Sequence, residues 1–235
     1  MIVCSRVSFW QTDTDLYKYL VYKPSGGDAR VSAQRETLYN RAGDEALYAG
    51  TERYLVDIAW VSNMSWKNDT DAAQTYVHTF TTELKIIQGS EVNNGFSLGA
   101  TYQGASVSFN HETKTFKSTE TTESRTITIT LTVPPRSYLV FYQRRYTFKD
   151  SIFFILDAWN QEWNVGSWGG YEFTWKDVDV QIMSEDYATL SADLDGFTTG
   201  TISVTTVARL PRAGITRKRE NITQRAKDKI ASMGV

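Results

Sequence analysis

The chain has 235 residues, of which 41% are hydrophobic and 22% are charged, and its formal net charge is −2. This length and apolar content are sufficient to bury the core of one elongated domain or of two small ones. No run of 18 apolar residues is present, and residues 1–6 lack the basic and apolar regions of a secretory signal peptide. We therefore expect no transmembrane helix, and a soluble protein that is secreted or released without a visible signal.

The first part of the chain predicts mixed structure, with strands at 3–10, 17–22 and 54–66. Residues 33–49 carry apolar residues at helical spacing with Gly50 behind them, which predicts one or two short helices. Residues 69–73 mark a boundary, and a long alternating strand is expected after them at 75–88. We expect residues 1–74 to form a head region that binds a receptor.

Two stretches of alternating character lie around a short turn between residues 92 and 115. Because a strand places successive side chains on opposite faces, the alternation predicts a hairpin with one apolar and one polar face. The turn is expected at Gln103 and Gly104, and each arm has the roughly 9 to 11 residues that a tilted strand needs to cross a bilayer. The apolar face carries Val92, Phe96, Leu98, Ala100, Tyr102, Ala105, Val107 and Phe109. The polar face includes Ser97, Thr101, Ser106, Ser108 and Asn110.

Alternation alone also fits a half-buried hairpin of an ordinary soluble protein. The context favours another interpretation, because 12 of the 25 residues from 108 to 132 are Ser or Thr. This stretch is too polar on both faces for a conventional core, it contains no proline, and Thr favours strands. It leads into a strand at 127–133, ended by Pro134 and Pro135, and another strand is expected at 137–148. No strand is followed by the helical pattern of a βαβ unit, so the sheets should be mostly antiparallel.

The order of these features resembles the aerolysin-like pore-forming toxins, particularly the epsilon-toxin and mosquitocidal-toxin branch. The features are Thr79-Phe80-Thr81-Thr82 opening a long strand, the amphipathic hairpin, the Ser/Thr-rich return strand and Val133-Pro134-Pro135. A second match is the glycine-punctuated strand at 194–207. The resemblance implies a mainly β fold of elongated, twisted antiparallel sheets. It places a pore-forming module at 75–150 and 191–211, and joins 151–190 to the head region.

The resemblance implies that the protein binds a cell surface, assembles into a ring of identical copies and inserts hairpins 92–115 as one membrane barrel. A closed barrel is the sheet that leaves no backbone group unpaired in lipid. Phe96, Leu98, Ala100, Tyr102, Ala105, Val107 and Phe109 would then belong to the inserted apolar face, with Gln103 and Gly104 at its tip. Ser97, Thr101, Ser106, Ser108 and Asn110 would face the water-filled lumen. Before insertion, Phe96, Leu98, Val107 and Phe109 must be covered by the rest of the protein.

Residues 212–235 form a basic tail, with seven Lys or Arg against two acidic residues and a net charge of +5. Arg217, Lys218 and Arg219 suit cleavage by a trypsin-like protease, and the resemblance implies a C-terminal activation peptide. The alternatives are an amphipathic helix with Ile222, Ala226 and Ile230 on one face, an anionic-lipid or nucleic-acid patch, or disorder. Nucleic acid is disfavoured because the rest of the chain is acidic.

A Trp-rich stretch is the candidate receptor-binding surface. Trp and Tyr stack on sugar rings or lie at the membrane interface, and the intervening amides satisfy hydroxyls or headgroups. The expected contact residues are Trp159, Trp163, Trp168 and Tyr171, for a glycan, lipid or protein receptor, and Tyr17, Tyr19 and Tyr22 are a second set. The alternative is that these rings belong to the core.

Enzymatic chemistry has little support in the sequence. His78 and His111 lack metal-ligand spacing, and neither a phosphate-binding glycine loop nor a nucleophile elbow is present. We therefore expect a protein that is not an enzyme and binds no metal or cofactor, although carboxylates distant in the chain keep a β-sandwich glycosidase as an alternative. Two functions remain: a pore-forming toxin, or a non-lytic β-rich lectin or surface-binding protein on the same scaffold.

Overall fold

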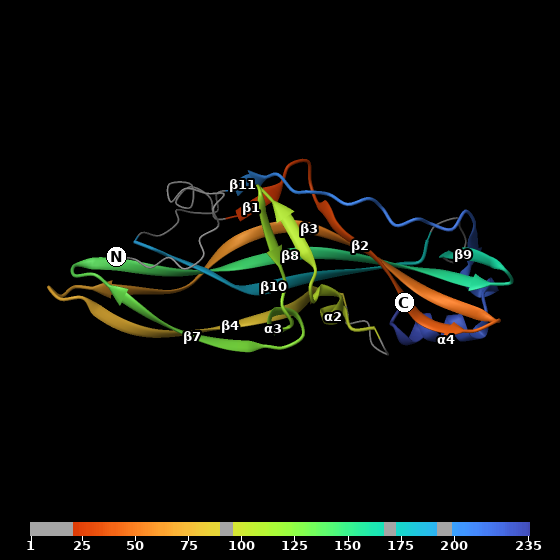
Figure 1. The fold of residues 1–235 in the computed structure, drawn as a ribbon, viewed down its shortest axis with the longest axis horizontal. Helices are drawn as coiled ribbons and strands as arrows, with labels where there is room; N and C mark the ends of the chain where they lie inside the picture. Colours follow the sequence, from red (N-terminus) through yellow and green to blue (C-terminus); the bar gives the residue numbers. More distant parts are fainter. Residues whose placement is uncertain (1–20, 90–95, 167–172, 192–198) are drawn as a thin grey trace.

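A computed structural model describes residues 21–89, 96–166, 173–191 and 199–235, and shows an elongated protein built around long twisted strands (Figure 1). The two longest strands, β3 (Glu45–Asn68) and β8 (Ser137–Ala158), are antiparallel and pair along their whole length. Their register shifts between Leu55 and Asp57 and again between Ser62 and Met64. Such bulges increase the local twist of a sheet.

In the described part of the chain, ten strands form one sheet, in the order β11-β1-β3-β8-β10-β4-β7, with β2 on β3 and β9 joining β8 to β12. Two pairings are parallel, β1 with β11 and β9 with β12, and the others are antiparallel. The predicted fold class, mainly β with elongated twisted antiparallel sheets, is therefore confirmed. The remaining strands are β1 (Val21–Pro24), β2 (Ala29–Arg41), β4 (Gln74–Gln88), β7 (Arg125–Val133), β9 (Gln161–Gly166), β10 (Trp175–Leu190), β11 (Thr199–Ile202) and β12 (Thr216–Lys218).

Strand β4 changes its partner halfway along its length. Its first part, Gln74 to Thr82, pairs with β7, whereas Glu83 to Gln88 pairs with β10. The predicted strands at 75–88 and 127–133 are confirmed as β4 and β7. Where β4 and β7 pair, one face is apolar and packs on a second, smaller core cluster, which contains Trp66, Phe80, Leu131, Val133, Leu139 and Phe141.

Small elements lie in the chain between β4 and β7, and they cross the middle of the long strands (Figure 1). We call residues 96–124 the folded segment. It contains α2 (Leu98–Tyr102), β5 (Ser106–Phe109), β6 (Glu112–Thr115) and α3 (Ser118–Thr121). Its apolar side chains join the main core, which also takes in the C-terminal helix α4 (Gln224–Ser232).

The short helices predicted at 33–49 are wrong: these residues form most of β2, a tight turn and the start of β3. Branched and aromatic side chains such as Thr37 and Tyr39 suit a strand, and β2 pairs with β3 almost to the turn, where Gly43 has a φ of +76°. The apolar residues of this strand hairpin recur at helical spacing by coincidence. The predicted strand at 3–10 and most of that at 17–22, with Tyr17 and Tyr19, lie outside the described residues. Among the described helices, none is long and apolar enough to span a bilayer.

Candidate functional site

The folded segment lies in the chain that connects the two strands of the β4–β7 ladder, after β4 has continued to Gln88 beside β10. The last pair of this ladder is Thr82 with Arg125, so the chain between them is the loop of a long hairpin in the topological sense. Instead of continuing that hairpin, the loop packs back on the sheet. This is the region in which the sequence predicts a membrane-inserting hairpin.

The predicted hairpin over 92–115 is wrong for the present fold. Residues 92–95 lie outside the described chain, and the rest of the first arm forms α2, capped by the Ser97 hydroxyl, which accepts a hydrogen bond from the Ala100 N–H. The hairpin that does form is the smaller β5–β6 pair, whose turn lies at Asn110 and His111 and not at Gln103 and Gly104. Tertiary contacts override the strand pattern here, because the helix places Leu98 and Tyr102 together on its buried side.

The apolar side chains of the folded segment are covered, as the sequence requires. The six largest, each at most 3% exposed, are Phe96, Leu98, Tyr102, Val107, Phe109 and Phe116. The Phe116 ring lies 5.1 Å from the Tyr146 ring, and the Tyr102 ring lies 5.4 Å from the Phe148 ring, so both pack on β8. Burial of each such side chain contributes about 1.5–3 kcal/mol.

The smaller predicted residues differ in exposure. Ala100 and Ser106 are exposed, Ala105, Ser108 and Asn110 are half-buried, and Thr101 is buried. Close packing of α2 on α3 explains the glycine at position 99, because a Cβ there would lie 2.5 Å from the Thr121 carbonyl oxygen.

A buried ion pair holds α2. Arg53 of β3 donates from Nε and Nη2 to the carboxylate of Asp150 on β8, at 2.9 Å each, and both side chains are almost fully buried. The same guanidinium donates to the hydroxyl of Thr101 at 2.8 Å and to its carbonyl at 3.2 Å, and the Tyr102 hydroxyl donates to Asp150 at 3.1 Å. Burial and the Asp150 carboxylate raise the pKa of the Tyr102 phenol well above its usual range. The end of α2 is therefore fixed by charge as well as by packing.

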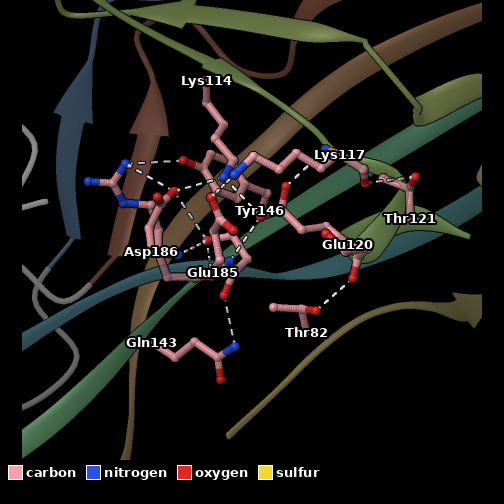
Figure 2. A network of polar contacts seen from close by, with 12 residues as sticks. Thr82, Lys114, Lys117, Glu120, Thr121, Gln143, Tyr146, Glu185 and Asp186 are labelled. Carbon is pink, nitrogen blue, oxygen red and sulfur yellow. Dashed lines mark hydrogen bonds and ion pairs between the residues drawn. The ribbon is translucent and has the colours of Figure 1, made fainter. Parts of the chain in front are cut away.

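A second polar network holds the β5–β6 hairpin and α3, as Figure 2 shows. Glu120 has no exposed surface, and its carboxylate accepts from Lys114 Nζ at 2.8 Å and from the backbone N–H groups of Glu185 at 2.9 Å and Lys117 at 3.0 Å. Lys114 also pairs with Asp186 of β10 at 3.1 Å. The hairpin supplies the cation, and α3 and β10 supply the anions.

Arg144 of β8 extends this network to a second residue of strand β6, Glu112. Its Nη1 lies 3.0 Å from the carboxylate of Glu112 and donates to the Tyr146 hydroxyl at 3.1 Å. Burial raises the pKa of Tyr146, which keeps this phenol neutral. Removing one partner of such a buried pair leaves a charge without compensation, at a cost of about 3–5 kcal/mol. The folded segment is thus secured by groups that depend on one another.

A strap of extended chain, residues 203–209, crosses the edge of this hairpin. Asn110 N–H donates to the Ser203 carbonyl and Thr205 N–H donates to the Ser108 carbonyl, both at 2.9 Å. Further along, Val207 N–H donates to the Arg30 carbonyl on β2, also at 2.9 Å. The strap connects β11 to the C-terminal tail, so the tail and the folded segment are mechanically linked.

The tail is ordered against the sheet. Ile222, Ala226 and Ile230 are buried, so the amphipathic-helix alternative is confirmed and the disordered-tail alternative is wrong. At the predicted cleavage site, the Arg217 guanidinium lies over the rings of Trp159 and Trp163, at 4.3 and 4.7 Å from their centroids.

The other two basic residues of that site differ from each other. Arg219 Nη2 donates to the Val235 carbonyl at 2.6 Å, and Lys218 is exposed.

Two of the predicted receptor residues, Trp159 and Trp163, lie beside the basic tail. Trp159 is 55% exposed and, with Asn160, forms a turn of left-handed residues between β8 and β9, while Trp163 is half-buried. The Arg217 guanidinium contacts both of these rings. Trp168 and Tyr171 lie outside the described residues.

Sequence reasoning missed the charged groups that hold the folded segment. A signal was present, because Arg144 and Asp150 interrupt an otherwise apolar and buried set of alternate residues in a central strand, from Val140 to Leu156. Glu112, Lys114 and Glu120 lie in the Thr-rich stretch, where nothing in the sequence distinguishes them. Among the described residues, no group of three His, Cys, Asp or Glu side chains is arranged to hold a metal ion.

Comparisons with known proteins find no matching family model and no matching curated protein. Three solved structures are similar. The oligomeric pore-forming toxin pro-monalysin has a TM-score of 0.39 at 14% identity, covering 84% of this chain and 78% of that one. The complex of lysenin with phosphocholine has a TM-score of 0.27 at 16% identity, covering 60% and 51%. The parasporin-2 toxin of Bacillus thuringiensis has a TM-score of 0.18 at 16% identity, covering 62% and 74%.

These similarities are remote, since every TM-score is below 0.5 and every identity is below 25%. The function proposed below therefore rests on the residues and contacts of this chain.

Proposed function

We propose that the protein is a pore-forming toxin, in which residues 83–124 unfold from the sheet and extend β4 and β7 into a membrane hairpin. The observation that carries this proposal is the register of the β4–β7 ladder. In every pair, from Gln74 with Val133 to Thr82 with Arg125, the two residue numbers add to 207. Continued without a bulge, this register places Tyr102 opposite Ala105 and leaves Gln103 and Gly104 as a two-residue turn.

The extended register also sorts the side chains. Partners across a ladder share a face, so Leu98 meets Phe109 and Ala100 meets Val107 on the face continuous with Phe80. The opposite face pairs Ser97 with Asn110 and Thr101 with Ser106. These are the lipid and lumen faces expected from the sequence, and the register that supports them is an independent observation.

The folded segment can unfold only if the strap that crosses its β5–β6 hairpin moves away. We propose that proteolysis in or next to the tail frees the strap, because the strap is hydrogen-bonded to β5 and continues into the tail. Arg217, Lys218 and Arg219 remain the proposed activation site, with Lys218 as its accessible side chain. Arg209 is a further candidate, since it is exposed and lies outside any helix or strand.

We further propose that the aromatic end of the molecule, with Trp159 and Trp163, contacts a receptor on the target cell. Copies concentrated on that surface would join their hairpins into one closed barrel, so that no strand edge remains in lipid. This places the activity at the target-cell membrane after secretion or release of the protein. The proposal assigns no catalytic step to any residue.

A disulfide across the small hairpin tests the proposal. Ser106 and Thr115 are cross-strand neighbours in β5–β6, with their hydroxyl oxygens 2.8 Å apart, whereas the extended register separates them by placing Ser106 opposite Thr101. The variant Ser106→Cys/Thr115→Cys, in a Cys4→Ser background, should release no dye from liposomes when oxidised. It should release dye after reduction, and the Ser106→Cys single variant should be active in both states.

Lysis by the oxidised double variant would show that the extended hairpin is not the inserting element. If the protein binds cells but releases no dye from any membrane, before or after limited trypsin treatment, the pore proposal fails. The surface-binding or lectin function would then remain.

A further inference from the structure

A cage of three aromatic rings surrounds Arg212 of the tail. Its guanidinium carbon lies 3.3 Å from the ring centroid of Phe153, 4.9 Å from that of Trp175 and 5.6 Å from that of Phe173. Cation–π attraction operates over this range, and it strengthens when the site is shielded from water. We call Phe153, Phe173 and Trp175 the aromatic cage.

The sheet builds this cage from neighbouring strands. Phe153 of β8 is opposite Gly50 of β3, and a Cβ at Gly50 would lie 2.1 Å from the ring. The glycine therefore lets the Phe153 ring lie flat on the β3 backbone and present its other face to Arg212. On the other side of β8, Trp175 is the cross-strand partner of Phe153, and its ring lies 5.4 Å from the Phe153 ring. Phe173 completes the cage, edge-on to Trp175 at 5.8 Å.

One carboxylate provides the charge at this site. Glu52 is 1% exposed, and its Oε1 lies 3.1 Å from Arg212 Nη2. The same carboxylate also accepts from the Leu210 N–H and the Tyr54 hydroxyl, so its acceptor capacity is largely used. Among the described residues, nothing accepts a hydrogen bond from the buried Arg212 Nη1.

The site thus provides ring faces and one negative charge, but few acceptors for a cation with many N–H groups. A guanidinium carries five N–H donors and is poorly matched to such surroundings. A quaternary ammonium group carries none, and it is the cation that aromatic cages recognise in general. Burial lowers the pKa of Arg212 while Glu52 opposes that shift, which is consistent with a cation held mainly by rings.

We propose that the aromatic cage is a binding site for a quaternary ammonium group, such as that of choline, and that Arg212 occupies it as an internal stand-in until the tail moves. A second arginine of the tail, Arg217, lies over the rings of Trp159 and Trp163, although Trp159 stays 55% exposed. The tail therefore occupies the aromatic cage as well as holding the strap. The cage would be a second contact with the receptor, separate from Trp159 and Trp163, and its biological use rests on the proposed function.

The full-length variant Arg212→Ala opens the cage without cutting the chain. Titration with choline chloride, followed by tryptophan fluorescence with Trp175 as reporter, should show binding at least about tenfold tighter than in the wild type, because the internal competitor is gone. Sodium chloride at equal ionic strength corrects for screening. Arg209→Ala removes an exposed arginine three residues away, and it should leave choline binding within about twofold of the wild type.

Further experiments identify the source of the quaternary ammonium group and provide a second variant in case Arg212→Ala misfolds. Vesicles of phosphatidylcholine should bind Arg212→Ala more tightly than vesicles of phosphatidylglycerol if a lipid headgroup is the ligand, whereas free choline with no vesicle preference would indicate a small molecule. Adding Phe173→Ala to Arg212→Ala should abolish the gain in choline affinity. If Arg212→Ala does not fold, Glu52→Gln/Arg212→Ala removes both charges, and choline should still bind to the aromatic cage of that double variant.

Absence of choline binding by a folded Arg212→Ala or Glu52→Gln/Arg212→Ala variant would overturn the inference, as would an equal gain in choline affinity in Arg209→Ala. These measurements need no lysis. Choline binding by a protein that never releases dye would therefore sink the pore proposal and leave the cage standing.

Discussion

The β4–β7 ladder and the folded segment share one sequence pattern and adopt different structures. In the ladder, alternation is realised directly, with Phe80 and Leu131 inward and threonines outward. In the folded segment, the same alternation is rearranged into a short helix, a small hairpin and another short helix. The alternating pattern therefore specifies which side chains are buried. Tertiary contacts determine whether the backbone that buries them is a strand or a helix.

The contacts that differ are electrostatic. The ladder is held by backbone pairing and an aromatic cluster, whereas the folded segment relies on Arg53, Arg144 and Lys114 with their buried carboxylates. In the extended register, Glu112 and Lys114 are on the lumen face, where water would solvate them. The charges that secure the present fold are therefore compatible with the extended one.

Breaking the Lys114 pair should have the largest effect. Lys114→Met leaves Glu120 buried without its cation, so the folded segment should lose about 3–5 kcal/mol of local stability while the ladder is unchanged. Hydrogen exchange should show faster exchange in α2, β5, β6 and α3 than in β4 and β7, and dye release should be faster. Lys117→Met removes an exposed ion pair with Glu185 and should cost at most about 1 kcal/mol. Equal exchange in the two variants would contradict the role of the buried network.

A matched pair of surface substitutions tests whether the faces of the ladder continue through the segment. Ala100 and Ser106 are both exposed in the present fold, but the extended register puts Ala100 toward lipid and Ser106 toward the lumen. An arginine on the lipid face costs about 2–4 kcal/mol at the bilayer midplane and less toward the tip of the hairpin, so Ala100→Arg should slow dye release severalfold. Ser106→Arg should lyse as the wild type does. Similar rates for the two would show that the register does not continue.

The sequence sufficed for features that depend on side-chain alternation and composition. It predicted β4, β7 and the mainly antiparallel β class, and it identified the covered apolar set that includes Phe96 and Val107, because these follow from which residues must leave water. It failed for the backbone of the folded segment and for 33–49. There, weak local preferences were settled by contacts between residues distant in the chain.

The buried ion pairs of the folded segment could not be predicted from the sequence for the same reason. Glu120 can be buried because α3 places it beside Lys114 and the Glu185 N–H, residues 6 and 65 positions away, and no local pattern encodes the second of these contacts. The aromatic cage is similar, since Glu52 comes from β3, Phe153 from β8, Trp175 from the start of β10 and Phe173 from just before it. Such sites become visible only when the sheet is assembled.

Cutting the strap tests whether it stabilises the folded segment, without a substitution in that segment or in the β4–β7 ladder. Trypsin should cut first after Arg209, because that side chain is exposed and its chain has few backbone contacts, whereas Arg217 is stacked and Arg219 is hydrogen-bonded. Mass spectrometry of timed digests locates the first cut, and Arg209→Gln should delay it while Arg217→Gln does not. The nicked protein should exchange faster in β5 and β6 and no faster in β4. A first cut after Lys218 would instead favour the activation site predicted from the sequence.

The smallest effect concerns the ladder itself and depends on pH. His78 lies in the aromatic cluster, 4.5 Å from Phe141 and 5.2 Å from Trp66, and burial lowers the pKa of its imidazole. A histidine whose pKa is lowered by folding binds protons more readily when unfolded, so the stability that it contributes is present above about pH 6.5 and is lost as the pH falls below that value. Urea unfolding across this range should show a loss that His78→Phe reduces, whereas His111→Asn, at an exposed turn, should leave it unchanged. If His78→Phe keeps the full loss of stability in acid, protonation of His78 is not its cause.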